Sequence, residues 1–191
     1  REGCFFVPFA DNSPINEVKY AVDCGLGGKG RNNLLLSNEH GSFCFIGEII
    51  TDCCCEISRP ANNPCDSCGA CIKACPTGAL TKDGFNKMLC LSDITQKRGE
   101  LTEFEKEAIA KSGYAWGCDI CQLACPKNKG KGKGLMQLSS HVYSKLNLSD
   151  IEGLTNRQFK DKFGDYAFSW RGKRVLLRNL HILDKGKRLN F

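Results

Sequence analysis

The chain has 191 residues, of which 41% are hydrophobic and 25% charged, with 14 cysteines and a formal net charge of +6. The apolar content excludes a disordered chain, and the lack of an apolar run of about 20 residues excludes a membrane span. Residues 1–126 carry 12 Lys and Arg against 16 Asp and Glu, whereas residues 127–191 carry 15 against 5. The basic C-terminal third is typical of a surface that binds a polyanion, although solubility alone can also produce it. No secretory signal is visible, and the start at Arg1 instead of methionine predicts a fragment or a processed chain.

The N-terminal third predicts one helix and one hairpin. Ser13 and Pro14 suit the N-cap and the first position of a helix that ends at Gly25. Two apolar runs, 34–37 and 42–50, are joined by NEHG and predict a β-hairpin. The glycine-rich GLGGKG before them matches a dinucleotide-binding loop only loosely; it also suits a turn that brings backbone close to a flat cofactor, or a plain turn.

Eight cysteines in the middle of the chain form an ordered pattern of two runs and one isolated residue: Cys65, Cys68, Cys71 and Cys75; Cys90; Cys118, Cys121 and Cys125. The first run has the spacing with which bacterial ferredoxins hold 4Fe-4S clusters, where the fourth cysteine binds the other cluster. This crossing rule assigns to cluster one Cys65, Cys68, Cys71 and Cys125. It assigns to cluster two Cys75, Cys118, Cys121 and, in place of the cysteine that a ferredoxin would have at Ala115, Cys90.

Other roles for these cysteines fit the pattern less well. Structural zinc would satisfy the CxxC pairs but does not need a run of four cysteines closed by proline. Disulfides do not require thiols in this repeated spacing. The remaining six cysteines carry no such pattern, and we expect most of them to be small buried hydrophobic residues: Cys4, Cys24, Cys44, Cys53, Cys54 and Cys55.

Three further helices are predicted after Cys90. The first begins with a capping box at Thr102 and ends at Gly113, and the second begins at Thr155 and ends at Gly164. Ser169 is predicted to begin the last helix, which carries Leu176, Leu180 and Leu183 on one stripe. Between them, 127–134 reads as a basic, glycine-rich strip.

Several motifs together resemble the epoxyqueuosine reductases, corrinoid and iron-sulfur enzymes of transfer-RNA modification. They are GLGGKGRNNLLL, CDSCGACIKACPTGAL, the displaced Cys90, WGCDICQLACPKN and FSWRGKRVLLRNL. Gly28, Lys29 and Gly30 replace a Trp-Ile-Gly that is usual in the family, so an aromatic wall for the corrin is expected to be missing. The family also carries a longer upstream part of the corrinoid pocket, which this chain is expected to lack.

The resemblance implies an activity, its cofactors and its site residues. It implies reduction of epoxyqueuosine to queuosine in tRNA, with two 4Fe-4S clusters relaying electrons to cobalamin. Asp11 would donate the proton that the leaving epoxide oxygen needs. Corrin contacts would come from Leu35, Ile46, Ile49 and Asp119. Contacts with tRNA would come from the basic C-terminal third: Lys127, Lys129, Arg171, Lys173, Arg174 and Arg178.

We therefore predict an α+β chain of three parts. Residues 1–60 would be the back half of a corrinoid-type α/β reductase domain, 61–130 a ferredoxin-like double 4Fe-4S domain, and 131–191 a basic helical segment. We expect a cytoplasmic monomer without membrane contact, which takes electrons from a ferredoxin or flavodoxin. Two other functions remain open, a ferredoxin-like electron carrier for a separate partner and a corrinoid reductase of a small molecule, as in the reductive dehalogenases.

Overall fold

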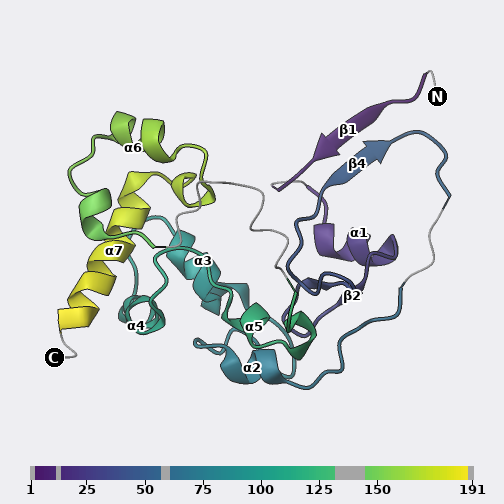
Figure 1. Ribbon diagram of the computed structural model, residues 1–191, viewed down its shortest axis with the longest axis horizontal. Coiled ribbons are helices and arrows are strands. Elements are labelled where there is room, and N and C mark those ends of the chain that lie inside the picture. The colour runs from purple at the N-terminus through teal and green to yellow at the C-terminus, as the bar shows by residue number, and fades with distance from the viewer. Residues whose placement is uncertain (1–2, 12–13, 57–60, 132–144, 189–191) are drawn as a thin grey trace. The chain divides into compact units, whose positions relative to one another are not determined.

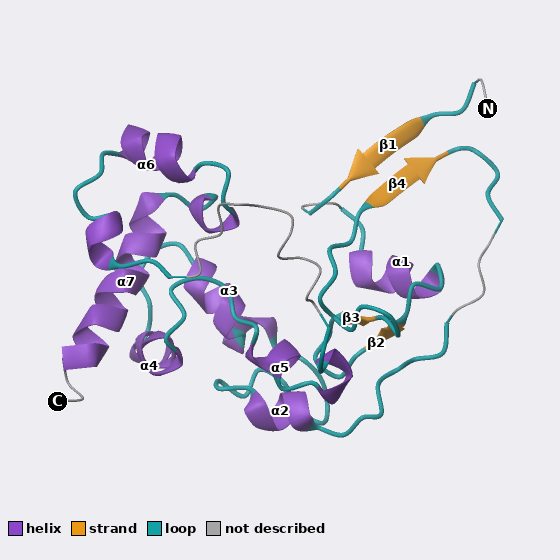
Figure 2. Ribbon diagram, viewed as in Figure 1, coloured by secondary structure: helices purple, strands orange, loops and turns teal. Residues whose placement is uncertain are grey.

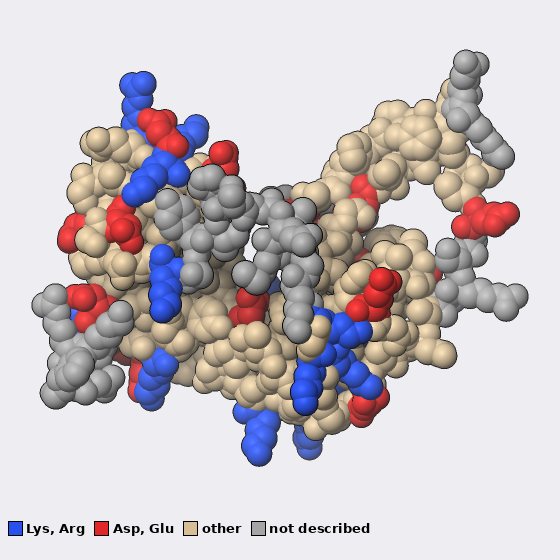
Figure 3. All heavy atoms as spheres, in the orientation of Figure 1, with Lys and Arg blue, Asp and Glu red and all other residues tan. Residues whose placement is uncertain are grey.

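The computed structural model describes residues 3–11, 14–56, 61–131 and 145–188. The chain is a mixture of helices and short strands (Figures 1 and 2), which confirms the predicted mixed class. It divides into two compact units, each made of two stretches of chain. Unit 1 comprises Arg1–Ala74 and Cys121–Leu138, and unit 2 comprises Cys75–Ile120 and Ser139–Phe191. Acidic and basic side chains are interspersed over α6, a helix of unit 2 (Figure 3). The three predicted domains stay a prediction.

Unit 1 contains two small antiparallel sheets. In the first, β1 (Phe6–Phe9) pairs with β4 (Glu48–Thr51), with Phe6 opposite Thr51. In the second, β2 (Gly28–Lys29) pairs with β3 (Leu35–Leu36). The helices of the unit are α1 (Glu17–Asp23) and α2 (Ala70–Ala74), with the 3-10 turn η2 (Pro126–Asn128).

Two predictions about this unit are wrong in detail. The first helix begins at Glu17, three residues after Pro14, because the side chain of Asn16 caps it by accepting from the Lys19 N–H; Ser13 lies outside the described residues. The expected hairpin is reduced to one bridge between Ser37 and Gly41 around the turn NEHG. Its two runs pair instead with other strands, and local alternation of apolar residues carries no information about such distant partners.

Unit 2 is helical. Its α-helices are α3 (Leu91–Gln96), α4 (Glu103–Ser112), α6 (Asn156–Phe163) and α7 (Lys173–Arg188), and α5 (Ile120–Leu123) contains the boundary with unit 1. Its described residues also form the 3-10 turns η1 (Lys87–Leu89), η4 (Leu148–Asp150) and η5 (Ala167–Ser169). Both predicted capping boxes are present, at Thr102 and Thr155, and both helices are followed by the predicted glycines.

The start of the last helix differs from the prediction. Ser169 closes the turn η5, and its hydroxyl donates to the Gly164 carbonyl instead of capping α7. Gly172, at φ +84°, then reverses the chain, a conformation that glycine adopts without a Cβ penalty. Therefore α7 begins at Lys173.

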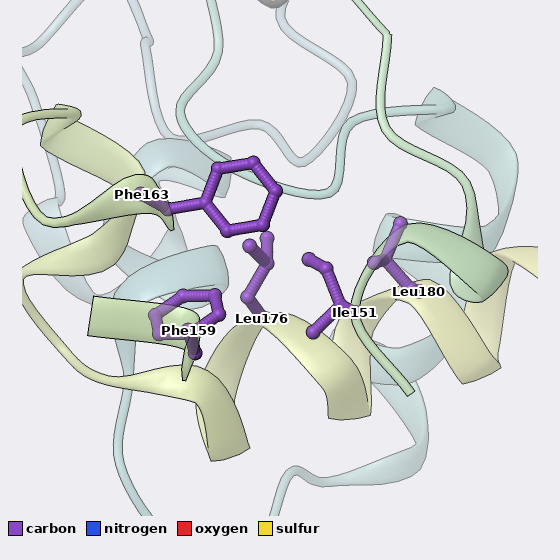
Figure 4. Packing of buried hydrophobic residues seen from close by; sticks show 5 residues of the cluster. All are labelled: Ile151, Phe159, Phe163, Leu176 and Leu180. Atoms are coloured by element: carbon purple, nitrogen blue, oxygen red, sulfur yellow. The ribbon is translucent and has the colours of Figure 1, made fainter. Parts of the chain in front are cut away.

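Two apolar clusters stabilise unit 2. Figure 4 shows the first, in which Phe159 and Phe163 from α6 and Leu176 and Leu180 from α7 surround Ile151. The second contains Leu91, Ile94, Leu101 and Ile109, with Leu183 packed against it. The predicted Leu176, Leu180 and Leu183 stripe is therefore confirmed as the side of α7 that packs inward. Asn179 is fully buried between these apolar residues of α7; its amide donates to the carbonyls of Thr95 (2.7 Å) and Ala115 (2.9 Å).

Candidate iron-sulfur centres

Four cysteines of unit 1 line one pocket. They are the four that the crossing rule assigned to cluster one: Cys65, Cys68, Cys71 and Cys125. Cys71 stands on α2, and Cys125 precedes η2. The space between the lining residues measures about 370 Å³ with open solvent included. Two segments that are more than 50 positions apart in sequence thus bring their thiols to one place, as a cluster with one borrowed ligand requires.

The thiols of this pocket interact electrostatically. Burial raises the pKa of Cys71 most, backbone N–H groups lower it, and the neighbouring Cys65 and Cys125 raise it further. Such a set is costly to deprotonate without a cation, because each thiolate disfavours the next. A cationic metal core reverses that balance, since a coordinating thiol is deprotonated outright. The donors therefore fit an iron-sulfur cluster.

In unit 2, three of the cysteines assigned to cluster two lie close together. The pKa of Cys118 is raised first by burial and then by Cys90 and Cys75. Cys75 has a lowered pKa: burial opposes the shift, but backbone N–H groups of Leu80, Thr77 and Ala79 outweigh it. These donors suit a thiolate that remains charged. The fourth predicted ligand, Cys121, follows Cys118 by three residues on α5 and belongs to unit 1; its ligand role stays a prediction.

The segment before Cys118 is held by buried hydrogen bonds within unit 2. The Thr95 hydroxyl of α3 accepts from the Gly117 N–H (3.0 Å), and the Asn179 amide holds the Ala115 carbonyl. Cys90 itself lies between η1 and the first turn of α3. Cys90 thus stands directly before α3, and α3 fixes the loop that carries Cys118.

The glycine-rich segment of unit 1 packs against the chain that enters the first cysteine run. A Cβ at Gly28 would meet the Asn63 side chain at 2.3 Å. The Asn63 amide donates to the Lys29 carbonyl (3.0 Å), and its oxygen accepts from the Cys65 N–H (3.0 Å). The lack of a side chain at Gly28 therefore allows the backbone to approach the segment around Asn63.

A second asparagine, Asn128, was not singled out from sequence. Its oxygen accepts from the Ser42 N–H (2.8 Å), and its nitrogen donates to the Ser42 hydroxyl (2.8 Å) and the Gln122 carbonyl (2.7 Å). Gly41, at φ +65°, makes room for it, since a Cβ there would lie 2.1 Å from the Asn128 oxygen. Asn128 follows Cys125 by three residues, but nothing local in the sequence indicates that its partner, Ser42, lies 86 positions away.

The six basic residues predicted to contact tRNA have different surroundings. Lys127 pairs with Asp66 (2.6 Å) and lines the cysteine pocket of unit 1, whereas Lys129 is exposed. Lys173 donates to the Glu152 and Leu154 carbonyls, and Arg178 donates to the Lys97 and Gly99 carbonyls, so both help to hold unit 2 together.

Arg171 and Arg174 lie with Lys173 around a shallow pocket of unit 2. It has about 960 Å³ of space that includes open solvent, and Lys160, which sequence reasoning missed, also lines it. The Arg171 guanidinium stacks over the Trp170 ring at 3.6 Å from the ring centroid, and Trp170 is 50% exposed. Cations beside an exposed aromatic ring suit nucleic acid.

The predicted proton donor, Asp11, is exposed and lies at φ +56° after β1. Near it, the pKa of Glu17 is raised by burial first and then by Glu48 and Asp11. Asp11, Glu17 and Glu48 therefore form a group of neighbouring carboxyls within unit 1. Of the three, only Asp11 was predicted from the sequence.

The residues predicted to contact a corrin are not equally accessible. Leu35 is buried, Ile46 is half-buried, and Ile49 is 67% exposed. Asp119 is exposed and belongs to unit 2. Of the predicted contacts in unit 1, Ile49 presents the most apolar surface to a flat cofactor.

The expectation for the six spare cysteines is wrong. Cys4 and Cys53 form a disulfide, and they face each other where the pairing of β1 with β4 is extended by two residues. Cys24, Cys54 and Cys55 are exposed, and Cys44 is half-buried. Few apolar residues are buried among the described residues of unit 1, so few positions there can enclose a cysteine.

Each of the two groups of cysteines draws on both runs, which indicates an iron-sulfur protein, and residues 64–128 match the family of 4Fe-4S double cluster binding domains. The chain is 37% identical over 183 residues to an epoxyqueuosine reductase of Listeria monocytogenes, covering 91% of this chain and 46% of the relative. It is 38% identical to that of Lactococcus garvieae, covering 92% and 50%. The chain belongs to the epoxyqueuosine reductase family, and it spans about half the length of these relatives.

Solved structures agree with this membership. The Streptococcus thermophilus epoxyqueuosine reductase superposes with a TM-score of 0.83 at 32% identity, covering 98% of this chain and 50% of that one. An epoxyqueuosine reductase solved with an epoxyqueuosine-modified tRNA-Tyr stem loop superposes with a TM-score of 0.82 at 31% identity, covering 94% and 48%. Among the described helices, none has the length and apolar character needed to cross a membrane.

Proposed function

We propose that this chain is the electron-relay and tRNA-contacting part of an epoxyqueuosine reductase, which reduces epoxyqueuosine to queuosine in tRNA. The observation that carries the proposal is the meeting of Cys65, Cys68, Cys71 and Cys125 around one pocket, in a chain of this family. Removal of the epoxide oxygen as water consumes electrons and protons. The protein must therefore supply a path for electrons and a donor of protons.

The electron path consists of two 4Fe-4S clusters with crossed ligands. Cluster one would be held by Cys65, Cys68, Cys71 and Cys125, and cluster two by Cys75, Cys90, Cys118 and Cys121. Because each cysteine run gives one ligand to the other cluster, the clusters are tied together by short stretches of chain, which favours electron transfer between them. Electrons would come from a ferredoxin or flavodoxin.

Cobalamin is proposed as the group that receives these electrons. When bound, it supplies a metal centre that reacts with the substrate carbon. Exposed apolar Ile49 and half-buried Ile46 suit contact with its corrin, whereas buried Leu35 would contribute from beneath the surface. The Asp119 backbone is a further proposed contact.

Asp11 is proposed to donate the proton that lets the epoxide oxygen leave. Its exposure gives it access to a substrate. Glu17 lies near it, and the pKa of Glu17 is raised by burial first and then by Glu48 and Asp11. A Bacillus subtilis relative was solved with its catalytic aspartate loop swung out of the active site. In this chain, Asp11 lies between β1 and α1.

The tRNA backbone is proposed to contact Arg171 and Arg174, with Lys129 and Lys160 as further exposed cations. Lys127, Lys173 and Arg178 have partners within their own units, so we assign them a smaller share of the binding energy than sequence alone suggested. A cytoplasmic monomer remains part of this proposal, since reduced clusters and tRNA occur together there.

The ligand assignment can be tested with paired cysteine variants of the whole protein, reconstituted without oxygen. Cys125→Ala should lose cluster one and Cys90→Ala cluster two, each with about half of the iron, while EPR still detects the other cluster. Cys54→Ala is the matched control and should keep all of the iron. Loss of the same cluster from both ligand variants would overturn the crossed assignment.

The activity can be tested in cells that lack the gene. Their tRNA should accumulate epoxyqueuosine, and the wild-type gene should restore queuosine. Asp11→Asn should keep both clusters but fail to restore queuosine, whereas Asp23→Asn, an exposed carboxylate paired with Lys19, should restore it. A normal queuosine profile without the gene would contradict the tRNA function and leave the electron-carrier function.

A further inference from the structure

The pocket of cluster one contains a buried amide that has a free donor. Asn32 lines the pocket together with Cys65, Cys68, Cys71 and Cys125, and it is only 6% exposed. Its Oδ1 accepts from the Leu34 N–H at 3.4 Å. Its Nδ2 is buried and has no hydrogen-bond partner among the described residues.

The surrounding loop fixes which end of this amide accepts. The Gly30 N–H donates to the Leu34 carbonyl (2.9 Å), and the Asn33 N–H donates to the Gly30 carbonyl (2.9 Å), which closes a tight loop around Asn32. Gly30 leaves the space that the amide oxygen occupies, since a Cβ there would lie 2.4 Å from it. A flipped amide would place its NH₂ group against the Leu34 N–H, two donors facing each other. The nitrogen is therefore the end left for a ligand.

A buried NH₂ group without an acceptor destabilises a folded protein by about 1–3 kcal/mol. This unpaired donor belongs to a residue that lines the same pocket as the four cysteines. The thiolates and sulfides of a 4Fe-4S cluster are negatively charged acceptors, and hydrogen bonds to the sulfurs are among the factors that set its reduction potential. A bound cluster would thus supply the missing partner.

We propose that Asn32 donates an N–H···S hydrogen bond to cluster one and thereby raises its reduction potential. The inference rests on the proposed ligation of that cluster. Adding one electron makes the cluster sulfurs more negative, so the hydrogen bond stabilises the reduced form more than the oxidised form. Asn32 therefore makes cluster one easier to reduce and tunes the electron path.

Neighbouring polar residues do not take this place. Asn63 is satisfied by the Lys29 carbonyl and the Cys65 N–H. Lys127, at the edge of the same pocket, pairs with Asp66, and its pKa is raised first by that hydrogen bond and also by Cys125 and Cys65. Lys127 acts through its charge, whereas Asn32 offers a neutral, directional donor.

The test is an EPR-monitored redox titration of the whole, anaerobically reconstituted protein. Asn32→Leu keeps the size of the side chain and removes its donor, so the midpoint of cluster one should become more negative. Asn32→Ser keeps a hydroxyl that can accept from Leu34 and donate, so its midpoint should lie between those of Asn32→Leu and the wild type. Cluster two is the internal control, and its midpoint should not move in Asn32→Leu. Exposed Asn38→Leu is the matched control, and it should leave the midpoint of cluster one unchanged.

A second measurement detects the hydrogen bond in the wild type, and the Asn32→Ser variant serves only to assign the signal. Wild-type protein labelled with ¹⁵N-asparagine should show a ¹⁵N hyperfine coupling to reduced cluster one, and ¹⁵N coupling should be lost in Asn32→Ser. An unshifted cluster-one midpoint in Asn32→Leu, or wild-type protein without that coupling, would overturn the proposal for Asn32. Absence of cluster one from the wild type would instead contradict the proposed function, so the two failures are distinguishable.

Discussion

The two units differ in what holds them together. Most of the buried apolar side chains of unit 2 form two clusters with aromatic and aliphatic members, and four helices contribute to them. Among the described residues of unit 1, the buried apolar set is Ala21, Leu35, Leu36 and Cys71, and the last of these is a predicted metal ligand. Its buried polar residues are Asn32, Ser42 and Asn128, and the last two join distant segments by hydrogen bonds.

This difference indicates two sources of stability. A small apolar set stabilises a fold weakly, because burial contributes about 25 cal/mol per Å² and must offset the ordering of the chain. Metal binding to a site that does not exist in the unfolded chain is itself folding free energy. Unit 1 should therefore depend on its cluster for order, whereas unit 2 should depend mainly on side-chain packing.

Removal of iron should have the largest effect on this contrast. After anaerobic chelation, unit 1 should lose amide protection over β2, β3 and α2, because its cysteine segments would no longer be tied together. The helices α4 and α7 should keep theirs, since their contacts are apolar. Hydrogen exchange followed by mass spectrometry measures both in one sample. Equal loss of protection in the two units would contradict the division.

Asn179→Ala should have the next largest effect, confined to unit 2. The variant leaves the buried Thr95 and Ala115 carbonyls without their donor, so we expect a loss of about 2–4 kcal/mol in the free energy of unfolding. Both tryptophans, Trp116 and Trp170, belong to unit 2, so fluorescence in urea reports on this unit.

The control for that variant is Asn156→Ala, an exposed substitution at the first position of α6. It should leave the urea midpoint almost unchanged. A similar loss in both variants would mean that the buried amide has no special role. Because Asn179 holds the carbonyl of Ala115, its variant should also release iron from cluster two faster than the wild type.

Features encoded by short spacings were predictable from sequence. The cysteine runs have their ligands within one or two turns of chain, and the capping boxes at Thr102 and Thr155 need only four consecutive residues. Both signals are local, so each remains readable without knowledge of the rest of the fold. The structure confirms both capping boxes, whereas the ligand roles of the cysteines stay a prediction.

Features that depend on distant partners were not predictable. Asn128 meets Ser42 across 86 positions, and Asn179 meets Thr95 across 84. In the same way, β4 pairs with β1 instead of the nearer run, and the charges of Lys173 and Arg178 are directed at backbone carbonyls. Single-residue chemistry identifies a donor or a charge, but the fold decides which acceptor it meets.

The smallest expected effect concerns Glu105, which ties α4 to the loop before it in unit 2. Its carboxylate accepts from Lys97 Nζ (2.8 Å) and the Thr102 N–H (2.8 Å). Burial opposes ionisation, but these donors outweigh it and lower the pKa of Glu105 below its ordinary value of 4.5. The folded pKa is the lower one, so this stabilisation is complete above pH 4.5 and is lost as the pH falls through the folded pKa.

Glu105→Gln should therefore reduce the free energy of unfolding by about 1 kcal/mol at neutral pH, since Lys97 is partly solvated and the ion pair is screened. The gap in urea midpoint between variant and wild type should begin to narrow below pH 4.5, where the unfolded wild type becomes protonated. It should close as the pH falls through the folded pKa, because the carboxyl is then protonated in both states. Acid damage to the clusters affects the wild type and Glu105→Gln alike, so it cancels when the two are compared at the same pH. Glu107→Gln, on the same helix with an exposed partner, Lys111, should change the midpoint less. A gap for Glu105→Gln that stays constant with pH would show that shape, and not charge, holds this end of α4 in place.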